Sequence, residues 1–446
     1  MTDRPEDILA AVMDRAKRAG ADAADALIYR SISQSVAVRL GEVEEIERSE
    51  NRDLGLRVLV GKRQATVSTN DYSPAALDEL AERAIMMAKL APEDPHVGLA
   101  DQALLAKGDL PDLDMTDGIE PSADDLRERA LACDDAGRAV EGVTNSGGAN
   151  ASYGYGQSWL ATSHGFAGSS TGGSHGTSVS LLAGSGTGME RDYDYHGATY
   201  LSDLRSPEDI GRSAGERTVR RLNPKKVGSR RAPVVYEQRL AASLLGPLAG
   251  AVNGAAIARG TSFLKDKMGE QLFEESVSVI DDPFIPRGFG SRPFDGEGVR
   301  PAKIALIDQG RLTSWFLNTA QANQLGLATN GRARRGTGGA PGSGATNLDL
   351  QPGGMDLQAL LADTGEGLYL TDMFGPQING NTGDYSVGCS GYWIEDGVPA
   401  YPVAEITIAG NLLEMWRHLT PASDFRRSGT RNAPTVRVAE MMIAGS

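Results

Sequence analysis

The first 92 residues alternate polar and apolar positions in a pattern that restricts them to a sheet flanked by helices. Residues 25–69 contain four segments with period-two alternation, ALIYRSISQSVAVRL, GEVEEIERSE, RDLGLRVLVG and KRQATVSTN, each closed by a Gly, an Asn or a charged turn. Apolar residues at helical spacing precede them over residues 5–19, and Ser73 with Pro74 opens a second helical segment. We therefore predict a helix, an antiparallel meander and a second helix in a domain of residues 1–92.

The same order of elements recurs after a connector at residues 93–121 that is rich in Pro and Asp. Ser122 precedes a helical segment, Ser-, Gly- and Tyr-rich segments with strand character follow, and Ser206 with Pro207 opens another helix. The composition of the connector predicts a linker or an extended surface segment. A middle α/β domain is therefore expected over residues 122–223.

Residues 224–446 differ in texture from both units. Short apolar segments such as GLYLTDMF and AEITIAGNLLEMW alternate with Gly-rich turns, and IDQGRL and IEDGVP are hairpin signals. These features predict a mainly β C-terminal domain with a few helices. The expected fold class is α+β, with N-terminal helix and antiparallel-sheet units followed by this mainly β domain.

Charge and cysteine content exclude several classes of partner. Lys and Arg total 44 against 59 Asp and Glu in 446 residues, and the net charge of −15 disfavours nucleic acid and anionic membrane surfaces. The two cysteines, Cys133 and Cys389, provide no disulfide framework, and the acidic first residues do not resemble a signal peptide. Polar residues and a proline interrupt the most apolar window, residues 240–258. We expect a cytoplasmic protein with no nucleic-acid or membrane partner.

The histidines are weak candidates for a metal site. None has HExxH spacing, which would place two imidazoles on one face of a helix. His164, His175 and His196 are each followed by Gly, and the first two lie in neighbouring strand-like segments, so a cross-strand pair is geometrically possible. No carboxylate or thiolate stands at a fixed offset from them, which favours ordinary sheet or surface histidines. We predict no metal ligand, with these three as the remaining candidates.

A Gly-rich segment, GRARRGTGGAPGSGATNLDL, holds three arginines that suit a carboxylate. Arg332, Arg334 and Arg335 are candidates for contact with a peptide C-terminus or an acidic partner surface, although solvated arginines are the simpler interpretation. The segment lacks the Gly-Lys-Ser/Thr ending of a phosphate-binding loop and is expected to be a mobile loop. Cys389 has no local base or positive field that would make it a nucleophile, so no catalytic residue is predicted.

The run VVYEQRLAASLLGPLAGAVNGAAIARGTSFL, residues 234–264, is a helix-forming stretch that follows a short strand and carries almost no chemistry. Its small residues allow neighbouring backbone to approach closely, and its leucines supply apolar contact. We therefore predict a helix in the core of the C-terminal domain.

Nearly the whole chain resembles the TldD/PmbA family. The resemblance rests on RDLGLRVLVGKRQATVSTND, ATNLDLQPG, GLYLTDMFGPQINGNTGDYSVGCSGYWIEDGVPAYPVAEITIAGNL and the terminal APTVRVAEMMIAG. TldD-type chains carry an HExxxH zinc motif on the helix that opens the C-terminal domain and a Cys ligand near the C-terminus, and PmbA chains, also called TldE, lack both. Here no His occurs between Tyr236 and Leu264, and the matching tail DFRRSGTRNAP has no Cys. The chain thus resembles the PmbA/TldE branch.

The resemblance implies a metallopeptidase in which this chain is the non-catalytic subunit, because Glu237 alone cannot hold a catalytic zinc. Such chains form a heterodimer with a zinc-bearing TldD-type chain and cleave small unfolded peptides in a closed chamber, where the peptide lies as an added strand. A homodimer is possible in isolation. We expect no cofactor in this chain and zinc in the partner. Two alternatives stay open: an autonomous metallopeptidase that uses His164, His175 and His196, and a non-enzymatic peptide-binding or assembly protein.

Overall fold

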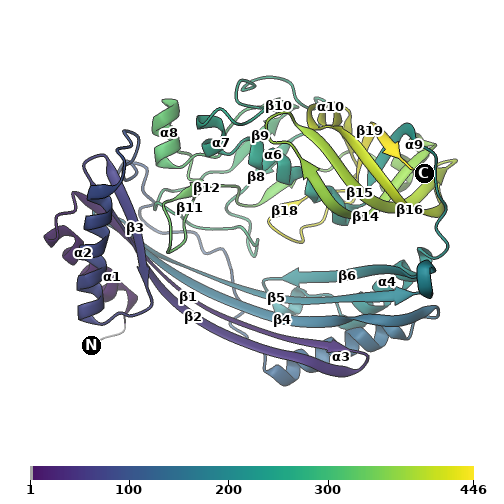
Figure 1. The fold of residues 1–446 in the computed structure, drawn as a ribbon, viewed down its shortest axis with the longest axis horizontal. Helices are drawn as coiled ribbons and strands as arrows, with labels where there is room; N and C mark the ends of the chain where they lie inside the picture. The colour runs from purple at the N-terminus through teal and green to yellow at the C-terminus, as the bar shows by residue number, and fades with distance from the viewer. Residues whose placement is uncertain (1–3, 446) are drawn as a thin grey trace.

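A six-stranded antiparallel sheet dominates the N-terminal half of the molecule (Figure 1). The computed structural model describes residues 4–445, and the strand order in this sheet is β3-β2-β1-β4-β5-β6. The predicted antiparallel meander is confirmed as β1 to β3, but its second and third predicted segments form the single strand β2. β1 also pairs with β4, so the strands before and after the connector share one sheet. The strands are β1 (Ala23–Arg39), β2 (Glu42–Val60), β3 (Arg63–Thr69), β4 (Val143–Thr162), β5 (Ala167–Ala183) and β6 (Glu190–Ala198).

Four helices cover one face of this sheet in two pairs. They are α1 (Pro5–Arg18), α2 (Pro74–Leu90), α3 (Ala123–Arg138) and α4 (Pro207–Arg220). The first two pack on β1 to β3, and the other two pack on β4 and β5 (Figure 1). The predicted starts of three helices are confirmed, because the side chains of Ser73, Ser122 and Ser206 each accept a backbone N–H of the first turn. Within residues 4–445 no helix is long and apolar enough to cross a bilayer.

The connector between the two helix pairs is extended and held on both sides. The backbone N–H of Arg287, in the C-terminal domain, donates to the carbonyl of Leu113 at 2.8 Å. Two residues later, Met115 accepts from the N–H of Gly173 in β5 at 2.7 Å. The connector therefore joins the large sheet to the C-terminal domain.

The C-terminal domain is built on a closed β-barrel, which agrees with the prediction of a mainly β domain. The pairing order is β16-β15-β14-β7-β19, and β16 also pairs with β19, which closes the ring. A smaller sheet with the order β10-β9-β8-β13-β18 lies beside it, and β11 and β12 form a hairpin.

The barrel strands are β7 (Arg230–Tyr236), β14 (Gly367–Ile378), β15 (Asp384–Glu395), β16 (Val398–Asn411) and β19 (Val436–Ala444). The short strand β17 (Leu419–Pro421) pairs with β19 outside this ring. The other strands are β8 (Val279–Asp281), β9 (Ile304–Asp308), β10 (Arg311–Leu312), β11 (Ala333–Arg334), β12 (Gly342–Ser343), β13 (Leu348–Leu350) and β18 (Arg431–Asn432). The helices that follow β10 are α8 (Thr319–Leu325), α9 (Leu357–Thr364) and α10 (Leu412–Arg417).

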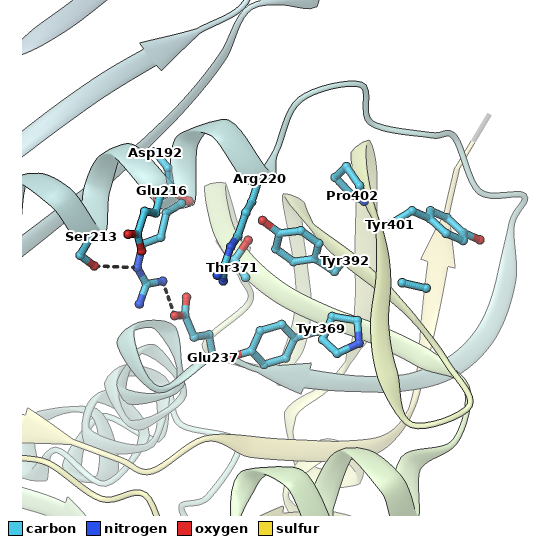
Figure 2. A pocket seen from close by; sticks show the side chains of 13 residues that line it. Asp192, Ser213, Glu216, Arg220, Glu237, Tyr369, Thr371, Tyr392, Tyr401 and Pro402 are labelled. Carbon is cyan, nitrogen blue, oxygen red and sulfur yellow. Dashed lines mark hydrogen bonds and ion pairs between the residues drawn. The ribbon is translucent and has the colours of Figure 1, made fainter. Parts of the chain in front are cut away.

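The C-terminal domain bridges the two ends of the large sheet (Figure 1). At one end the β11–β12 hairpin lies on β1 and β2, where Asp25 accepts from Arg57 Nε at 2.7 Å and pairs with Arg335. At the other end α4 meets the barrel, where Arg217 pairs with Glu237 (Figure 2). These two junctions hold the face of the sheet that the helices leave uncovered against the C-terminal domain.

Gly55 of β2 is required by the hairpin contact. A Cβ atom at this position would lie 2.4 Å from the carbonyl oxygen of Thr337, which is backbone and cannot rotate away. We expect Gly55→Val to destabilise the protein by about 1–3 kcal/mol through this overpacking. Hydrogen–deuterium exchange of residues 333–343 should rise in the variant. Gly98→Val is the control, because Gly98 has open space around its Cα, and equal exchange in the two variants would contradict the prediction.

The predicted helix of residues 234–264 is interrupted. After β7 it divides into α5 (Gln238–Ala241), the 3₁₀ turn η3 (Ala242–Leu244), α6 (Leu245–Ala251) and α7 (Gly254–Ala258). The break falls at Asn253, whose side chain caps α7 by accepting from the Ala255 N–H. The flanking backbone bonds to a distant segment, since Phe316 donates to Val252 and accepts from Gly254. A single continuous helix is therefore wrong, because pairing with this distant segment ends α6.

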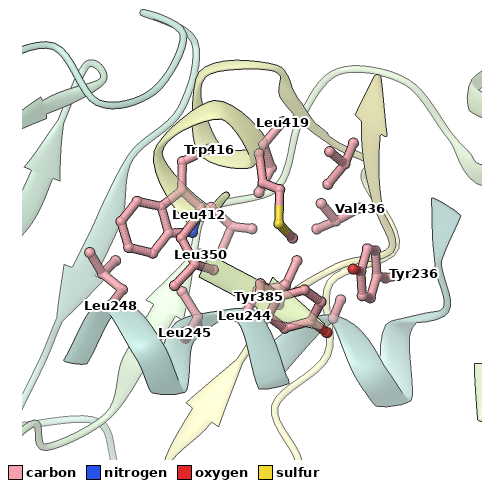
Figure 3. Close-up of a cluster of buried hydrophobic side chains, with 14 of the residues drawn as sticks. Tyr236, Leu244, Leu245, Leu248, Leu350, Tyr385, Leu412, Trp416, Leu419 and Val436 are labelled. Atoms are coloured by element: carbon pink, nitrogen blue, oxygen red, sulfur yellow. The ribbon is translucent and has the colours of Figure 1, made fainter. Parts of the chain in front are cut away.

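The predicted core role of the same stretch is confirmed. Leu244, Leu245 and Leu248 are buried in the largest hydrophobic cluster of the molecule. Figure 3 shows them facing the aromatic rings of Tyr385 and Trp416, which come from β15 and α10. The leucines of this stretch thus join the barrel to the helices that follow β7.

Candidate functional site

The uncovered face of the large sheet carries small polar side chains. Successive residues of a strand point to opposite faces, so β1, β4 and β5 each contribute every second residue to this face. These residues are Tyr29, Ser31 and Ser33 in β1, Gly154, Gly156 and Ser158 in β4, and Ser170, Gly172 and Ser174 in β5. Serine and glycine are small, so space remains above the sheet here, and the serines supply uncharged hydroxyl groups.

Two adjoining cavities lie between this face and the C-terminal domain. Their volumes are about 520 and 280 Å³. Both are lined by Tyr29, Ser158, Ser170, Phe289 and Ser291, so they form one continuous space, which we name the Ser/Gly-lined cavity. Hydroxyl groups both donate and accept hydrogen bonds. The cavity therefore suits an extended main chain whose side chains can vary.

Among residues 4–445, no strand pairs with one edge of β5 over residues 167–174. β6 pairs with β5 only from His175 onward, while β4 pairs with β5 along its whole length. The N–H of Gly173 points to this outer edge, where it donates to Met115. Because main-chain groups alternate between the two edges of a strand, the N–H and C=O of Thr171 point to the same outer edge. An extended peptide can add to the sheet there as a further strand.

Two of the three predicted arginines, Arg334 and Arg335, line the Ser/Gly-lined cavity. The side chain of Arg335 is 1% exposed and pairs with Asp25. Burial lowers the pKa of Arg335 to about 10, so its guanidinium stays charged at neutral pH. Arg334 is exposed, and its Nη2 donates to the carbonyl of Ala345. A peptide carboxylate can therefore reach Arg334 without breaking an ion pair.

Arg332 lies in the core of the C-terminal domain rather than in the cavity wall. Its side chain is fully buried, its Nε stands 2.5 Å from Asp281 Oδ2, and its Nη2 donates to Ala302 O at 2.6 Å. Burial raises the pKa of Asp281 and lowers the pKa of Arg332. The expectation that these arginines are solvated is therefore wrong for Arg332 and Arg335. The segment expected to be a mobile loop forms the β11–β12 hairpin, and Arg335 beside it pairs with Asp25 of β1.

The structure does not bring His164 and His175 together. His164 lies in the turn between β4 and β5, where its Nε2 is 2.7 Å from the carbonyl oxygen of Ala100. His175 lies in the middle of β5 and is paired with Tyr153. The cross-strand pair that the sequence left possible does not form, because His164 lies in the turn and the turn is far from the middle of β5.

Within the described residues, the imidazoles of His175 and His196 each have one hydrogen-bond partner. His175 is buried, and its Nε2 is 3.2 Å from Asp117 Oδ2. His196 in β6 accepts from the Arg205 N–H at 3.2 Å through Nδ1, and burial lowers its pKa. Over residues 4–445, no group of three or more His, Cys, Asp or Glu side chains is placed to hold a metal ion.

The segment that resembles the zinc helix meets the tail that resembles the position of the Cys ligand. A Cβ atom at Gly246 in α6 would lie 3.6 Å from Nη1 of Arg431 in β18. Thr430, next to Arg431, lines the Ser/Gly-lined cavity. Glycine offers no ligand, and a guanidinium is itself a cation that cannot coordinate a metal. The residues at this meeting point therefore do not fit a zinc ion.

The residues that line the cavity were missed by motif reasoning. Its hydroxyl groups belong to the strands predicted from SISQS, SYGYGQS and GSSTGGS, in which Ser or Gly occupies alternate positions. A period-two run of small polar residues on neighbouring strands is the signal that would have located this face.

Three family models match successive parts of the chain. They describe PmbA/TldA metallopeptidase domain 1 over residues 24–88, the central domain over residues 117–222 and the C-terminal domain over residues 229–445. The structure of TldE from Thermococcus kodakarensis superposes with a TM-score of 0.88 at 21% identity, covering 98% of this chain and all of that one. This likeness shows a shared fold.

Sequence relatives extend over the same range. Metalloprotease PmbA of Escherichia coli O157:H7 is 35% identical over 95% of this chain and 92% of its own length. The metalloprotease PmbA homolog of Haemophilus influenzae is 33% identical over 97% of this chain and 94% of its own length. With three matching domain models and relatives of this similarity along almost its whole length, the chain belongs to the PmbA/TldD metallopeptidase family.

Proposed function

We propose that this chain is a PmbA/TldE-type subunit that holds peptides for hydrolysis by a zinc-bearing TldD-type partner. The observation that carries the proposal is a Ser/Gly-lined cavity beside the point where Gly246 of α6 meets Arg431 of the tail, two residues whose side chains cannot coordinate zinc. In this proposal, small unfolded peptides enter the cavity, and the partner supplies the metal.

The shape and chemistry of the cavity support peptides as the substrate class. An unfolded peptide presents an N–H and a C=O at every residue, and strand addition satisfies both through the open edge of β5 at Thr171. The Ser and Gly residues beside that edge are small and uncharged, so they accommodate most side chains of a bound peptide. Arg334, which has no ion-pair partner within the described residues, is placed at the wall to bind a terminal carboxylate.

The test is to measure zinc and peptide cleavage for this chain alone, for the TldD-type partner alone and for the mixture. We expect zinc well below stoichiometric amounts in the isolated chain, prepared without a metal-affinity tag, and no cleavage of an unfolded peptide. Cleavage should appear in the mixture and disappear when the zinc motif of the partner is removed. A cytoplasmic heterodimer is the expected assembly, and the isolated chain is expected to form a homodimer.

Two results would overturn the proposal in different ways. Stoichiometric zinc with cleavage by the isolated chain would favour the autonomous enzyme, and variants of His164, His175 and His196 would then be the next step. Formation of the complex with peptide binding but without cleavage would favour a non-enzymatic peptide-binding protein.

A further inference from the structure

A second cavity, of about 700 Å³, lies between α4 and the barrel strands β14, β15 and β16 (Figure 2). It shares no lining residue with the Ser/Gly-lined cavity. Its walls include Arg220 of α4, Tyr369 and Thr371 of β14, and Tyr392 of β15. The inference drawn from it does not depend on the proposed function.

The carboxylates at the base of this cavity are already paired. Glu237 accepts from Arg239 Nη2 at 2.9 Å and also pairs with Arg217, as the dashed line in Figure 2 shows. Asp192 accepts from Arg239 Nη1 at 3.2 Å and lies 3.7 Å from Arg221. These ion pairs hold α4 and β6 on the barrel, and a ligand in the cavity meets carboxylates that are already paired with arginines.

Two donors above this base lack a partner among the described residues. Thr371 is 4% exposed, and its hydroxyl group is buried without a hydrogen bond in the part of the chain described. Arg220 forms no ion pair with any residue between 4 and 445, and Figure 2 shows it beside Thr371 and Tyr392. A buried hydroxyl without a partner costs free energy, so an acceptor is expected to occupy the space in front of it.

The two tyrosines add to the same set of donors. Tyr369 and Tyr392 are paired across β14 and β15, and both line the cavity. Burial raises the pKa of both phenols, so each keeps its proton at neutral pH and can donate a hydrogen bond. The guanidinium of Arg220 and the hydroxyl groups of Thr371 and Tyr392, which lie beside one another in Figure 2, match a carboxylate or phosphate.

A carboxylate on α4 indicates that the ligand carries a positive group as well as a negative one. Glu216 also lines the cavity, is exposed and pairs with no cation within the described residues. It precedes Arg220 by four residues, which places the two Cβ atoms about 5–6 Å apart on one face of α4. An inorganic anion gains nothing from Glu216, whereas a molecule with a carboxylate and an ammonium group pairs with both side chains.

We propose that this cavity binds a short free peptide, with its carboxylate on Arg220, Thr371 and Tyr392 and its ammonium group on Glu216. The termini of an extended dipeptide are separated by about 7 Å. The long side chains of Glu216 and Arg220, which start from Cβ atoms about 5–6 Å apart, can diverge to reach both termini. The tyrosine rings and Pro402 form the apolar surface against which a peptide side chain packs.

The test is calorimetric titration of the full chain with Ala-Phe dipeptide. Two analogues separate the termini, since the C-terminal amide removes the carboxylate and N-acetylation removes the ammonium group. We expect Arg220→Gln to weaken binding of the free dipeptide about 10-fold or more, as the loss of one charge-assisted contact predicts. The amide should bind equally weakly to Arg220→Gln and to the unaltered chain. Glu216→Gln should weaken the free dipeptide but leave the N-acetyl analogue unchanged.

Arg212→Gln is the matched control, because Arg212 lies on the same helix, is exposed and does not line the cavity. Thr371→Val provides a second measure, and it should lower dipeptide affinity several-fold while the variant stays folded. Absence of binding at about 10 mM dipeptide, well above the Kd expected for such contacts, would overturn the proposal. It would also be overturned if inorganic phosphate bound as tightly as the dipeptide and Glu216→Gln changed neither affinity, since the site would then be a general anion site.

Discussion

Replacing Asp25 with alanine is expected to lower the free energy of unfolding by about 3–5 kcal/mol, as for a buried ion pair that loses one partner. Asp25 is 1% exposed, and its carboxylate accepts from Arg57 Nε at 2.7 Å and pairs with Arg335. The substitution leaves two buried guanidinium groups without the carboxylate that they share. Chemical denaturation followed by far-ultraviolet circular dichroism measures the loss.

The effect is also expected to be local. Arg335 reaches Asp25 from 310 residues further along the chain, and its Nη2 donates to the Asp25 carbonyl at 3.4 Å as well. This contact holds the β11–β12 hairpin on β1. Hydrogen–deuterium exchange over residues 333–343 should therefore increase in Asp25→Ala even under conditions in which the barrel remains folded.

Glu366→Ala is the control for charge removal as such. Glu366 pairs with Arg230 at 3.1 Å, but both side chains are about half exposed or more. Water screens such a pair, so its loss is expected to change stability by less than about 1 kcal/mol. If Asp25→Ala destabilised the protein no more than Glu366→Ala, the ion pairs of Asp25 with Arg57 and Arg335 would not hold the hairpin on the sheet as we infer.

Local patterns predict the secondary structure of the N-terminal half well. Period-two alternation locates β1 to β3, and Ser73, Ser122 and Ser206 begin helices because a serine hydroxyl satisfies a free N–H in the first turn. These signals act within a few residues. They do not show that β1 pairs with β4, which joins both units in one sheet and depends on packing across the connector.

Non-local contacts explain what sequence reasoning did not find. The segment with Arg332 and Arg335 has the composition of an exposed loop, yet Asp281 and Asp25 bury those two side chains. Similarly, Phe316 divides the predicted long helix at Asn253 through backbone hydrogen bonds. In both cases the partner is distant in sequence, and neither composition nor periodicity carries information about it.

The Ser/Gly-lined cavity could be predicted only in part from the sequence. Its Ser and Gly residues follow from a pattern in the strands, but a polar strand face is usually just solvated. Its significance depends on the C-terminal domain, whose Phe289 and Ser291 close the space above Ser170. The sequence therefore contains the lining of the site without revealing that it is enclosed.

Filling the Ser/Gly-lined cavity is expected to abolish peptide cleavage by the proposed complex with a TldD-type partner. Gly172 lies in β5 in the cavity wall, and a Cβ atom there would have open space around it. Gly172→Phe therefore places a ring in the cavity without a clash in the backbone. We expect peptide cleavage to fall by about 100-fold or more, because a peptide displaced by about 1 Å already reacts about that much more slowly.

Gly188→Phe is the matched control, because Gly188 also has open space but lies in the exposed turn before β6, outside the cavity. A second variant, Thr171→Pro, separates occlusion from strand addition. Proline removes the N–H at the outer edge of β5 and adds little bulk, and proline is tolerated at a free strand edge. If the peptide adds as a strand, Thr171→Pro should reduce cleavage about 10-fold, the effect of losing the one main-chain hydrogen bond that this N–H donates. Full cleavage in both Gly172→Phe and Thr171→Pro would show that peptides do not use this cavity, whereas loss in Gly172→Phe alone would show that they enter it without pairing with β5.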